Sequence, residues 1–224
     1  GEHHHHPGLH SGDLFHKPTV NPLAMRVAVA GLETLRDAGV PVLAVEGNHE
    51  KAYYRDQYSW LEFLDAMEYL QLLNPAFEEG RAILTPHGEG GGAYADVADG
   101  IRVYGLKYYG ASTSKALTSL IDALESVDDS GVTYTILMMH AGLEGQLAHM
   151  GRLRMSDLAP LRGGIDYIAL GHIHKPYAVN DWIFNPGSPE TCSIQEARMS
   201  PNRGAYVVET HPGDDPPHRI QRFV

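Results

Sequence analysis

The sequence has one cysteine, no long hydrophobic run and few basic residues. Cys192 is the only cysteine among 224 residues, which excludes a framework of internal disulfides and favours a reducing compartment. No apolar run approaches the ~18–20 residues that a membrane-spanning helix needs, and the N-terminus lacks the basic-then-apolar pattern of a signal peptide. We therefore expect a cytoplasmic protein without a membrane segment.

The charge balance is acidic. There are 28 Asp and Glu residues against 17 Lys and Arg, a formal net charge of −11. This composition argues against a simple basic DNA-binding module, in which Lys and Arg would cluster. It does not exclude a nucleic-acid enzyme that holds phosphates through bound cations, because metal ions reverse the local field. Fourteen histidines are a high count for a chain of this length.

Hydrophobic patterning predicts alternating strands and helices. Asn21 as N-cap, Pro22 in the first turn and Gly39 as a stop predict a helix over residues 21–39. A further helix is expected near 114–127, and apolar, β-branched segments predict strands near 40–46, 101–108, 133–140, 165–171, 181–186, 204–210 and 218–224. Mixed helices and strands on this scale imply an α/β layered sandwich.

Residues 56–73 predict another helix, which carries more apolar residues than one buried stripe uses. The expected core-facing set is Trp60, Leu64 and Met67, and the expected outward set is Leu61, Phe63 and Leu70. Such a helix is either deeply buried in its own domain or also contacts a partner subunit. The second interpretation predicts a homodimer through the helices at 21–39 and 56–73.

Polar residues recur just after the predicted strands. They are Asp13 in GDLFH, Asn48 and His49 in GNHE, His140 in MMHAG, and His172 and His174 in GHIH. Residues at such junctions point into the crevice at the carboxyl edge of a sheet. Each one alone could be a turn residue or a hydrogen-bonded structural histidine. Together, carboxylate, amide oxygen and imidazole suit Mn²⁺, Fe or Zn²⁺.

The series GDLFH, GNHE, MMHAG, GHIHKP and NPGSPE resembles the signature motifs of calcineurin-like metallophosphoesterases. Within that superfamily it is most similar to the DNA double-strand-break repair nucleases, the SbcD-type exonuclease branch, over roughly residues 11–210. The resemblance implies an α-β-β-α sandwich and a metal-dependent phosphodiesterase acting as a DNA exo/endonuclease with an SMC-like ATPase partner. The alternatives are a catalytically incomplete DNA- or partner-binding scaffold subunit, or a metallophosphoesterase acting on nucleotides or phosphoproteins.

The resemblance also implies residue roles. Two divalent metals, expected to be Mn²⁺, would be bridged by Asp13. Asn48, His140 and His172 would complete the second site, and His174 would bind the first ion. His49 would lie beside the scissile phosphate as a catalytic residue without binding metal. His16 could face the substrate, or it could contact other site residues without touching the substrate.

The N-terminus departs from the family pattern. An Asp-x-His motif, a helix and a second strand should precede Asp13, yet only twelve residues do so, and we expect no strand among them. Glu2-His3-His4 imitates the motif only in spelling. We therefore interpret residues 1–10 as a disordered purification-tag remnant or foreign leader, and residues 11–224 as a nuclease core truncated at its N-terminus. The competing interpretation is a degenerate His-rich ligand segment.

Overall fold

The computed structural model describes residues 6–50, 58–97, 100–146, 152–199 and 203–223. Its centre is a six-stranded sheet in the order β12-β13-β11-β8-β7-β6. The four inner strands run parallel, and the two edge strands run antiparallel to their neighbours. From one edge to the other they are β12 (Tyr177–Val179), β13 (Ile183–Asn185), β11 (Tyr167–Gly171), β8 (Tyr134–His140), β7 (Ile101–Leu106) and β6 (Tyr94–Val97).

A second, parallel sheet has the order β1-β2-β3, formed by β1 (Gly8–His10), β2 (Val42–Ala44) and β3 (Gln71–Leu72). β14 (Ala205–Thr210) and β15 (His218–Phe223) form an antiparallel hairpin. Two short pairs complete the strands, β4 (Ala76–Glu78) with β5 (Arg81–Ile83), and β9 (Gly142–Leu143) with β10 (Arg152–Leu153).

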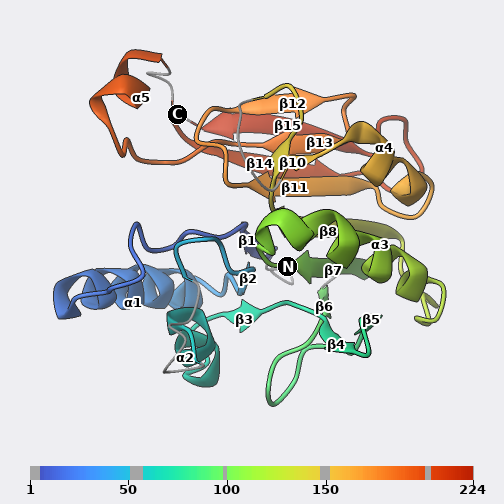
Figure 1. Ribbon diagram of the computed structural model, residues 1–224, viewed down its shortest axis with the longest axis horizontal. Coiled ribbons are helices and arrows are strands. Elements are labelled where there is room, and N and C mark those ends of the chain that lie inside the picture. The colour runs from blue at the N-terminus through green and yellow to red at the C-terminus, as the bar shows by residue number, and fades with distance from the viewer. Residues whose placement is uncertain (1–5, 51–57, 98–99, 147–151, 200–202, 224) are drawn as a thin grey trace.

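The helices lie on the outside of the sheets, with α3 in front of β7 and β8 in Figure 1. They are α1 (Pro22–Asp37), α2 (Trp60–Ala66), α3 (Thr113–Leu124), α4 (Met155–Leu158) and α5 (Ile194–Met199), with 3₁₀ turns at Gly110–Ser112 and Ala159–Leu161. α1 begins as predicted, because the Asn21 side chain accepts a hydrogen bond from the backbone of Ala24 and Pro22 fits the first turn.

Three apolar cores separate four layers. One core packs α3 and α4 against the six-stranded sheet. The second lies between that sheet and the layer made by β1-β2-β3 and β14-β15. The third packs α1 and α2 against the outer face of β2. The expected α-β-β-α sandwich is therefore confirmed.

The predicted helix over 56–73 is wrong in extent. Among the described residues α2 ends at Ala66, Glu68 takes a left-handed φ of 59°, and the chain continues as β3. The Asp65 side chain stabilises this break, because its Oδ1 accepts a hydrogen bond from the backbone N–H of Leu72 at 3.0 Å. A side chain that satisfies a backbone N–H beyond the helix competes with helix continuation.

The faces assigned to this helix are also largely wrong. Leu61 and Leu64 are fully buried, and Leu70 is buried in the turn after the helix. Trp60 and Met67 are instead 40% and 52% exposed, whereas Phe63, at 38% exposed, faces outward and Leu64 faces the core as predicted. The reason is tertiary. Leu61 and Leu64 pack with Leu32 of α1 and Ala44 of β2 in one core, and periodicity alone does not say which stripe faces the sheet.

The expectation that no strand precedes Asp13 is wrong. Gly8–His10 form β1, which pairs in parallel register with Val42–Ala44 of β2, so these three residues are not a disordered leader. The strand was missed because Gly and His are weak strand formers and β1 is only three residues long. Residues 1–5, including Glu2-His3-His4, lie outside the described residues, and the tag interpretation of that stretch stays a prediction.

No helix in the described part of the chain is long and apolar enough to cross a membrane.

Candidate metal centre

Strand ends from both sheets bring the predicted residues together. Asp13 follows β1, and Asn48 and His49 follow β2. His140 is the last residue of β8, and it pairs with Gly171 of the parallel strand β11, directly before His172. The Ser11 hydroxyl donates a hydrogen bond to the carbonyl of Ala169 at 3.2 Å. That bond joins the end of β1 to β11, so two sheets converge on one edge.

Four side-chain atoms meet at this edge. Asn48 Oδ1 lies 3.0 Å from His140 Nε2 and 2.9 Å from His172 Nδ1. The two imidazole nitrogens are 3.2 Å apart, and His140 Nε2 is 3.3 Å from Asp13 Oδ2. Ligands bound at ~2.0–2.2 Å from one cation lie roughly 3 Å from each other when they are cis. The separations therefore match a single metal-binding cluster.

The protonation state of His140 indicates whether these residues suit a metal ion. Its Nδ1 lies 2.7 Å from the carbonyl oxygen of Ser11, and a carbonyl can only accept, so Nδ1 carries the proton. In the neutral ring the Nε2 lone pair then faces Asp13 Oδ2 and Asn48 Oδ1, which are acceptors too. Buried acceptors this close repel each other unless a cation lies among them. The residues present therefore fit a divalent metal.

The electrostatics favour the ligating forms of these groups. Burial alone raises the pKa of Asp13, but hydrogen bonding and charge interaction with His140 and the His49 backbone N–H outweigh it and lower that pKa. Burial, followed by the like charge of His140, lowers the pKa of His172 to about 4. At neutral pH Asp13 is thus a carboxylate and His172 a neutral imidazole, the states that bind metals.

The backbone is strained at the same place. Asp13 has φ of 62° and His172 has φ of 86°, a region that non-glycine residues rarely occupy. Gly12 and Gly47 allow the loops to approach, since a Cβ at Gly12 would overlap His140 and one at Gly47 would overlap Asp13. Strain of this kind, of order 1–3 kcal/mol per residue, typically persists where function requires a fixed geometry.

Glu50 holds the loops in place, and the sequence reasoning missed it. This side chain is 2% exposed. Its Oε2 accepts hydrogen bonds from the backbone N–H groups of Asp13 and Gly47 at 2.8 Å each, and its Oε1 accepts one from Phe15 at 3.0 Å. Burial raises the pKa of Glu50 despite these bonds. The sequence feature that could have identified Glu50 was its position in GNHE, directly after the predicted site residues.

His49 and His16 stand at the open side of the centre. The His49 backbone N–H donates to Asp13 Oδ1 at 3.0 Å, and its ring Nε2 lies 3.9 Å from Asp13 Oδ2. The exposed ring of His16 stacks on that of His49 with centroids 5.6 Å apart. Both imidazoles are therefore beside the four-residue cluster rather than within it. Their catalytic roles stay predictions.

Tyr108 is a further neighbour that the motif comparison did not identify. It follows β7, and its ring centroid lies 5.8 Å from that of His140 and 5.4 Å from that of His172. A tyrosine just after a buried strand, in the segment LKYYG, was the available signal. The ring forms one wall of the centre.

His174 does not join the four-atom cluster. Its Nδ1 lies 3.0 Å from Glu196 Oε1, and its ligand atoms group with those of Glu196 and Cys192. A separate group of potential ligand atoms consists of Asp13, His140 and His172, which lie within 4.8 Å of one another. The five predicted ligands therefore fall into a cluster of four, with Asn48 included, and one residue beside it.

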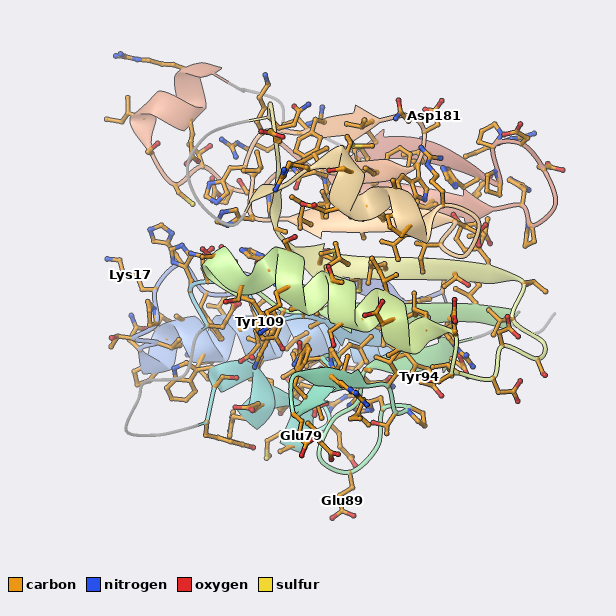
Figure 2. The ribbon with its side chains drawn as sticks, turned by 45° about the vertical axis from the view of Figure 1, so that its right-hand side comes forward. Lys17, Glu79, Glu89, Tyr94, Tyr109 and Asp181 are labelled. Carbon is orange, nitrogen blue, oxygen red and sulfur yellow. The ribbon has the colours of Figure 1, made fainter. Side chains whose placement is uncertain are left out.

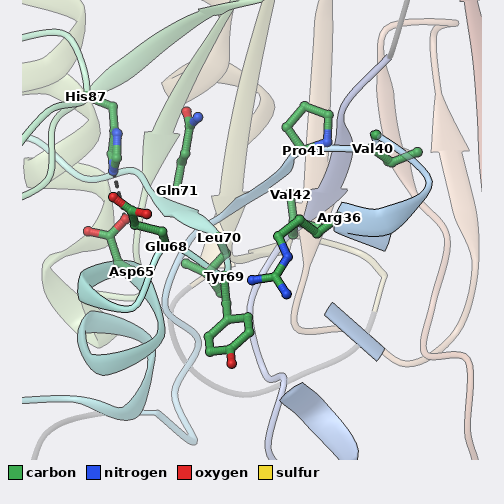
Figure 3. A pocket seen from close by; sticks show the side chains of 11 residues that line it. Arg36, Val40, Pro41, Val42, Asp65, Glu68, Tyr69, Leu70, Gln71 and His87 are labelled. Atoms are coloured by element: carbon green, nitrogen blue, oxygen red, sulfur yellow. Dashed lines mark hydrogen bonds and ion pairs between the residues drawn. The ribbon is translucent and has the colours of Figure 1, made fainter. Parts of the chain in front are cut away.

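A cavity of about 490 Å³ lies elsewhere, near the start of β2 and β3 (Figure 3). His87 Nε2 lies 2.8 Å from Asp65 Oδ1 at one side of it, and Arg36 and Tyr69 lie at another. Asn48 and His49 of the metal centre follow the opposite, carboxyl end of β2. The cavity therefore lies away from the metal centre.

The geometry agrees with the sequence comparison. The family model described as calcineurin-like phosphoesterase matches residues 9–176, which include the four clustered residues and His174. The chain belongs to the calcineurin-like phosphoesterase family.

Among curated relatives, the chain is similar to the DNA double-strand break repair protein Mre11 of Saccharolobus solfataricus. The two are 27% identical over 209 residues, which cover 90% of this chain and 49% of that protein. Mre11 of Haloferax volcanii is 30% identical over 91% of this chain and 40% of its own length. The uncharacterized metallophosphoesterase YhaO of Bacillus subtilis is 25% identical over 92% and 46%. The chain spans half or less of these relatives.

Proposed function

We propose that the chain carries the catalytic core of a Mn²⁺-dependent DNA exo/endonuclease that acts in double-strand-break repair. The observation that supports this most is the convergence of Asp13, Asn48, His140 and His172 with potential ligand atoms 2.9–3.3 Å apart. Family membership supports phosphoester hydrolysis. The similarity to Mre11 proteins of several archaea supports DNA as the substrate.

In this proposal Asn48, His140 and His172 would hold one metal ion, His174 would help to hold a second, and Asp13 would serve both. Two divalent ions held there would bind the phosphate and lower the pKa of an attacking water. His49 would donate a proton or a hydrogen bond to a phosphoryl or leaving oxygen. His16, stacked on His49, orients that ring or contacts the substrate itself.

The acidic chain has few basic side chains that could bind DNA phosphates, so each basic residue near the metal centre is important for DNA binding. Lys17 adjoins His16, is exposed, and projects from the side of the molecule in Figure 2, on a different side from Glu79, Glu89 and Asp181. We propose that Lys17 contacts the DNA backbone. Such a contact would position the strand without reading its bases.

We also propose a homodimer through α1 and α2, now with the corrected faces. Leu23 and Val27 of α1 are 61% and 63% exposed, and Trp60 and Phe63 of α2 and Met67 directly after it are also exposed. The two helices share one core and lie together in Figure 1. Each Å² of this apolar surface removed from water stabilises the contact by ~25 cal/mol. An SMC-like ATPase is the proposed further partner, and the cytoplasm the proposed location.

Nuclease assays with linear double-stranded DNA and Mn²⁺ test the activity. We expect cleavage that EDTA abolishes and that His140→Ala lowers by at least 10³-fold. Arg219→Ala, a substitution on β15 and distant from the metal centre, serves as the control for nonspecific effects of mutation and purification. Cleavage that survives both EDTA and His140→Ala would contradict the proposal.

The alternatives give different results in the same set of assays. A nucleotide or phosphoprotein phosphatase would hydrolyse p-nitrophenyl phosphate far better than its bis ester and would leave DNA intact. A scaffold subunit would bind DNA or a partner without hydrolysing either. Preference for the diester together with DNA cleavage supports the nuclease.

A further inference from the structure

Glu196 connects the metal centre to α5, and the motif comparison assigned it no role. Its Oε1 lies 3.0 Å from His174 Nδ1. Its Oε2 accepts hydrogen bonds from the Cys192 backbone N–H at 3.0 Å and from Arg203 Nη2 at 3.4 Å. Both carboxylate oxygens are therefore used, and the carboxylate is fixed from two sides.

Arg203 contacts both His174 and Glu196. Its Nη1 donates to the backbone carbonyl of His174 at 3.1 Å and also to the Ser188 hydroxyl. The Arg203 side chain is only 10% exposed. One guanidinium thus binds the backbone of His174 and the carboxylate that contacts the ring of His174. This arrangement limits both the position and the rotation of that imidazole.

A carboxylate can only accept, so the bond to Glu196 requires the proton on Nδ1 of His174. A neutral ring then keeps its lone pair on Nε2. Metal-binding histidines commonly donate their other N–H to a carboxylate, which sets the tautomer and the ring orientation. We propose that Glu196, held by Arg203, is a positioning residue that presents Nε2 of His174 to a metal ion. This inference rests on the proposed function in one respect, namely that His174 is a ligand.

The same three side chains allow a different outcome. Cys192, His174 and Glu196 have potential ligand atoms within 4.8 Å of one another, a set that could bind Zn²⁺ directly. The hydrogen bonds favour positioning, because Glu196 already uses both oxygens and Cys192 is exposed. A direct site would need the Cys192 thiolate, whereas positioning does not use the thiol at all.

The first experiment reads the tautomer of His174 by ¹H–¹⁵N NMR in metal-free protein near pH 8. We expect the Nδ1–H form in the unmodified protein and a shift toward the Nε2–H form in Glu196→Ala. Glu196→Gln, which keeps an acceptor oxygen, should restore the Nδ1–H form. The matched control is Glu190→Ala, since the Glu190 side chain accepts a hydrogen bond from the neighbouring Thr191 backbone N–H rather than from His174. An unchanged tautomer in Glu196→Ala would overturn the proposal.

The second experiment titrates Mn²⁺ by calorimetry. We expect Glu196→Ala to weaken the binding of one ion by 10- to 100-fold, to leave the ion at Asp13 and His140 in place, and to be rescued by Glu196→Gln. Cys192→Ser should change nothing. Loss of metal in Cys192→Ser would show the direct site instead. Failure of the unmodified protein to bind Mn²⁺ would refute the proposed function, while the tautomer result would still decide the role of Glu196.

Discussion

His140 Nε2 lies 3.0 Å from Asn48 Oδ1, and the other nitrogen of the same ring donates to the Ser11 carbonyl at 2.7 Å. The carbonyl fixes the tautomer, so two acceptor atoms face each other at hydrogen-bond distance with no proton to share. This relationship explains why the centre suits a cation.

Binding of Mn²⁺ should stabilise the folded protein. At a free concentration of 100 times the dissociation constant, the free energy of unfolding should rise by about 2.7 kcal/mol. His140→Ala and Asn48→Ala should each remove most of this gain. Thermal unfolding with and without Mn²⁺ measures it, with His16→Ala as the control that retains the gain. An equal gain in all three variants would place the ion elsewhere.

His49→Ala should abolish DNA cleavage and leave Mn²⁺ binding unchanged. The His49 ring Nε2 is 3.9 Å from Asp13 Oδ2, beside the cluster, so its effect should be on the transition state rather than on metal content. Turnover measured together with metal content by mass spectrometry checks this. A variant that loses its Mn²⁺ would make His49 a ligand.

Glu50→Gln should lower the free energy of unfolding by about 1–3 kcal/mol, because the amide replaces one of the two acceptor oxygens and leaves a buried N–H of the loop without a partner. It should also weaken Mn²⁺ binding, because Asp13 loses its fixed position. Urea unfolding and Mn²⁺ titration measure the two effects. Glu68→Gln, at an exposed turn residue, is the control. A stability equal to that of the unmodified protein would contradict the role of Glu50.

Stability should fall in acid partly through His218. Burial lowers the pKa of this histidine below its usual 6.5, and its Nδ1 lies 2.8 Å from the Tyr134 hydroxyl. The unfolded chain takes up the proton first, so this contribution is complete above pH 6.5 and is lost as the pH falls toward the folded-state pKa. Urea unfolding between pH 8 and 5 should show that the free energy of unfolding falls less steeply with pH in His218→Gln than in the unmodified protein. An equally steep fall in both proteins would remove His218 as a contributor.

The dimer prediction now distinguishes two faces of α2. Phe63→Glu with Met67→Glu should convert a dimer to a monomer with little change in thermal stability, because both side chains are exposed. Leu61→Ala should instead cost about 2–5 kcal/mol, the usual loss for a buried leucine. Light scattering and urea unfolding separate the outcomes. A monomeric unmodified protein at micromolar concentration would exclude a stable homodimer.

Local sequence chemistry was sufficient to predict the strand-end motifs and the helix start at Asn21. Each depends on local chemistry. Apolar β-branched runs form buried strands, polar residues directly after them lie at the sheet edge, and an Asn-Pro pair begins a helix. Asn48, His140 and His172 could therefore be predicted to converge, whereas Asp13, which follows the unpredicted strand β1, could be placed with them only by its motif.

Tertiary structure decided the rest. Leu61 and Leu64 face the core because Leu32 and Ala44 lie opposite them, and helical periodicity contains no such information. The three-residue strand β1 exists because β2 offers it a hydrogen-bonding partner. Glu50 contacts Asp13 and Glu196 contacts His174, and the two residues of each pair are distant in the sequence. Contacts of this kind depend on how the layers pack, and packing is a property of the whole chain.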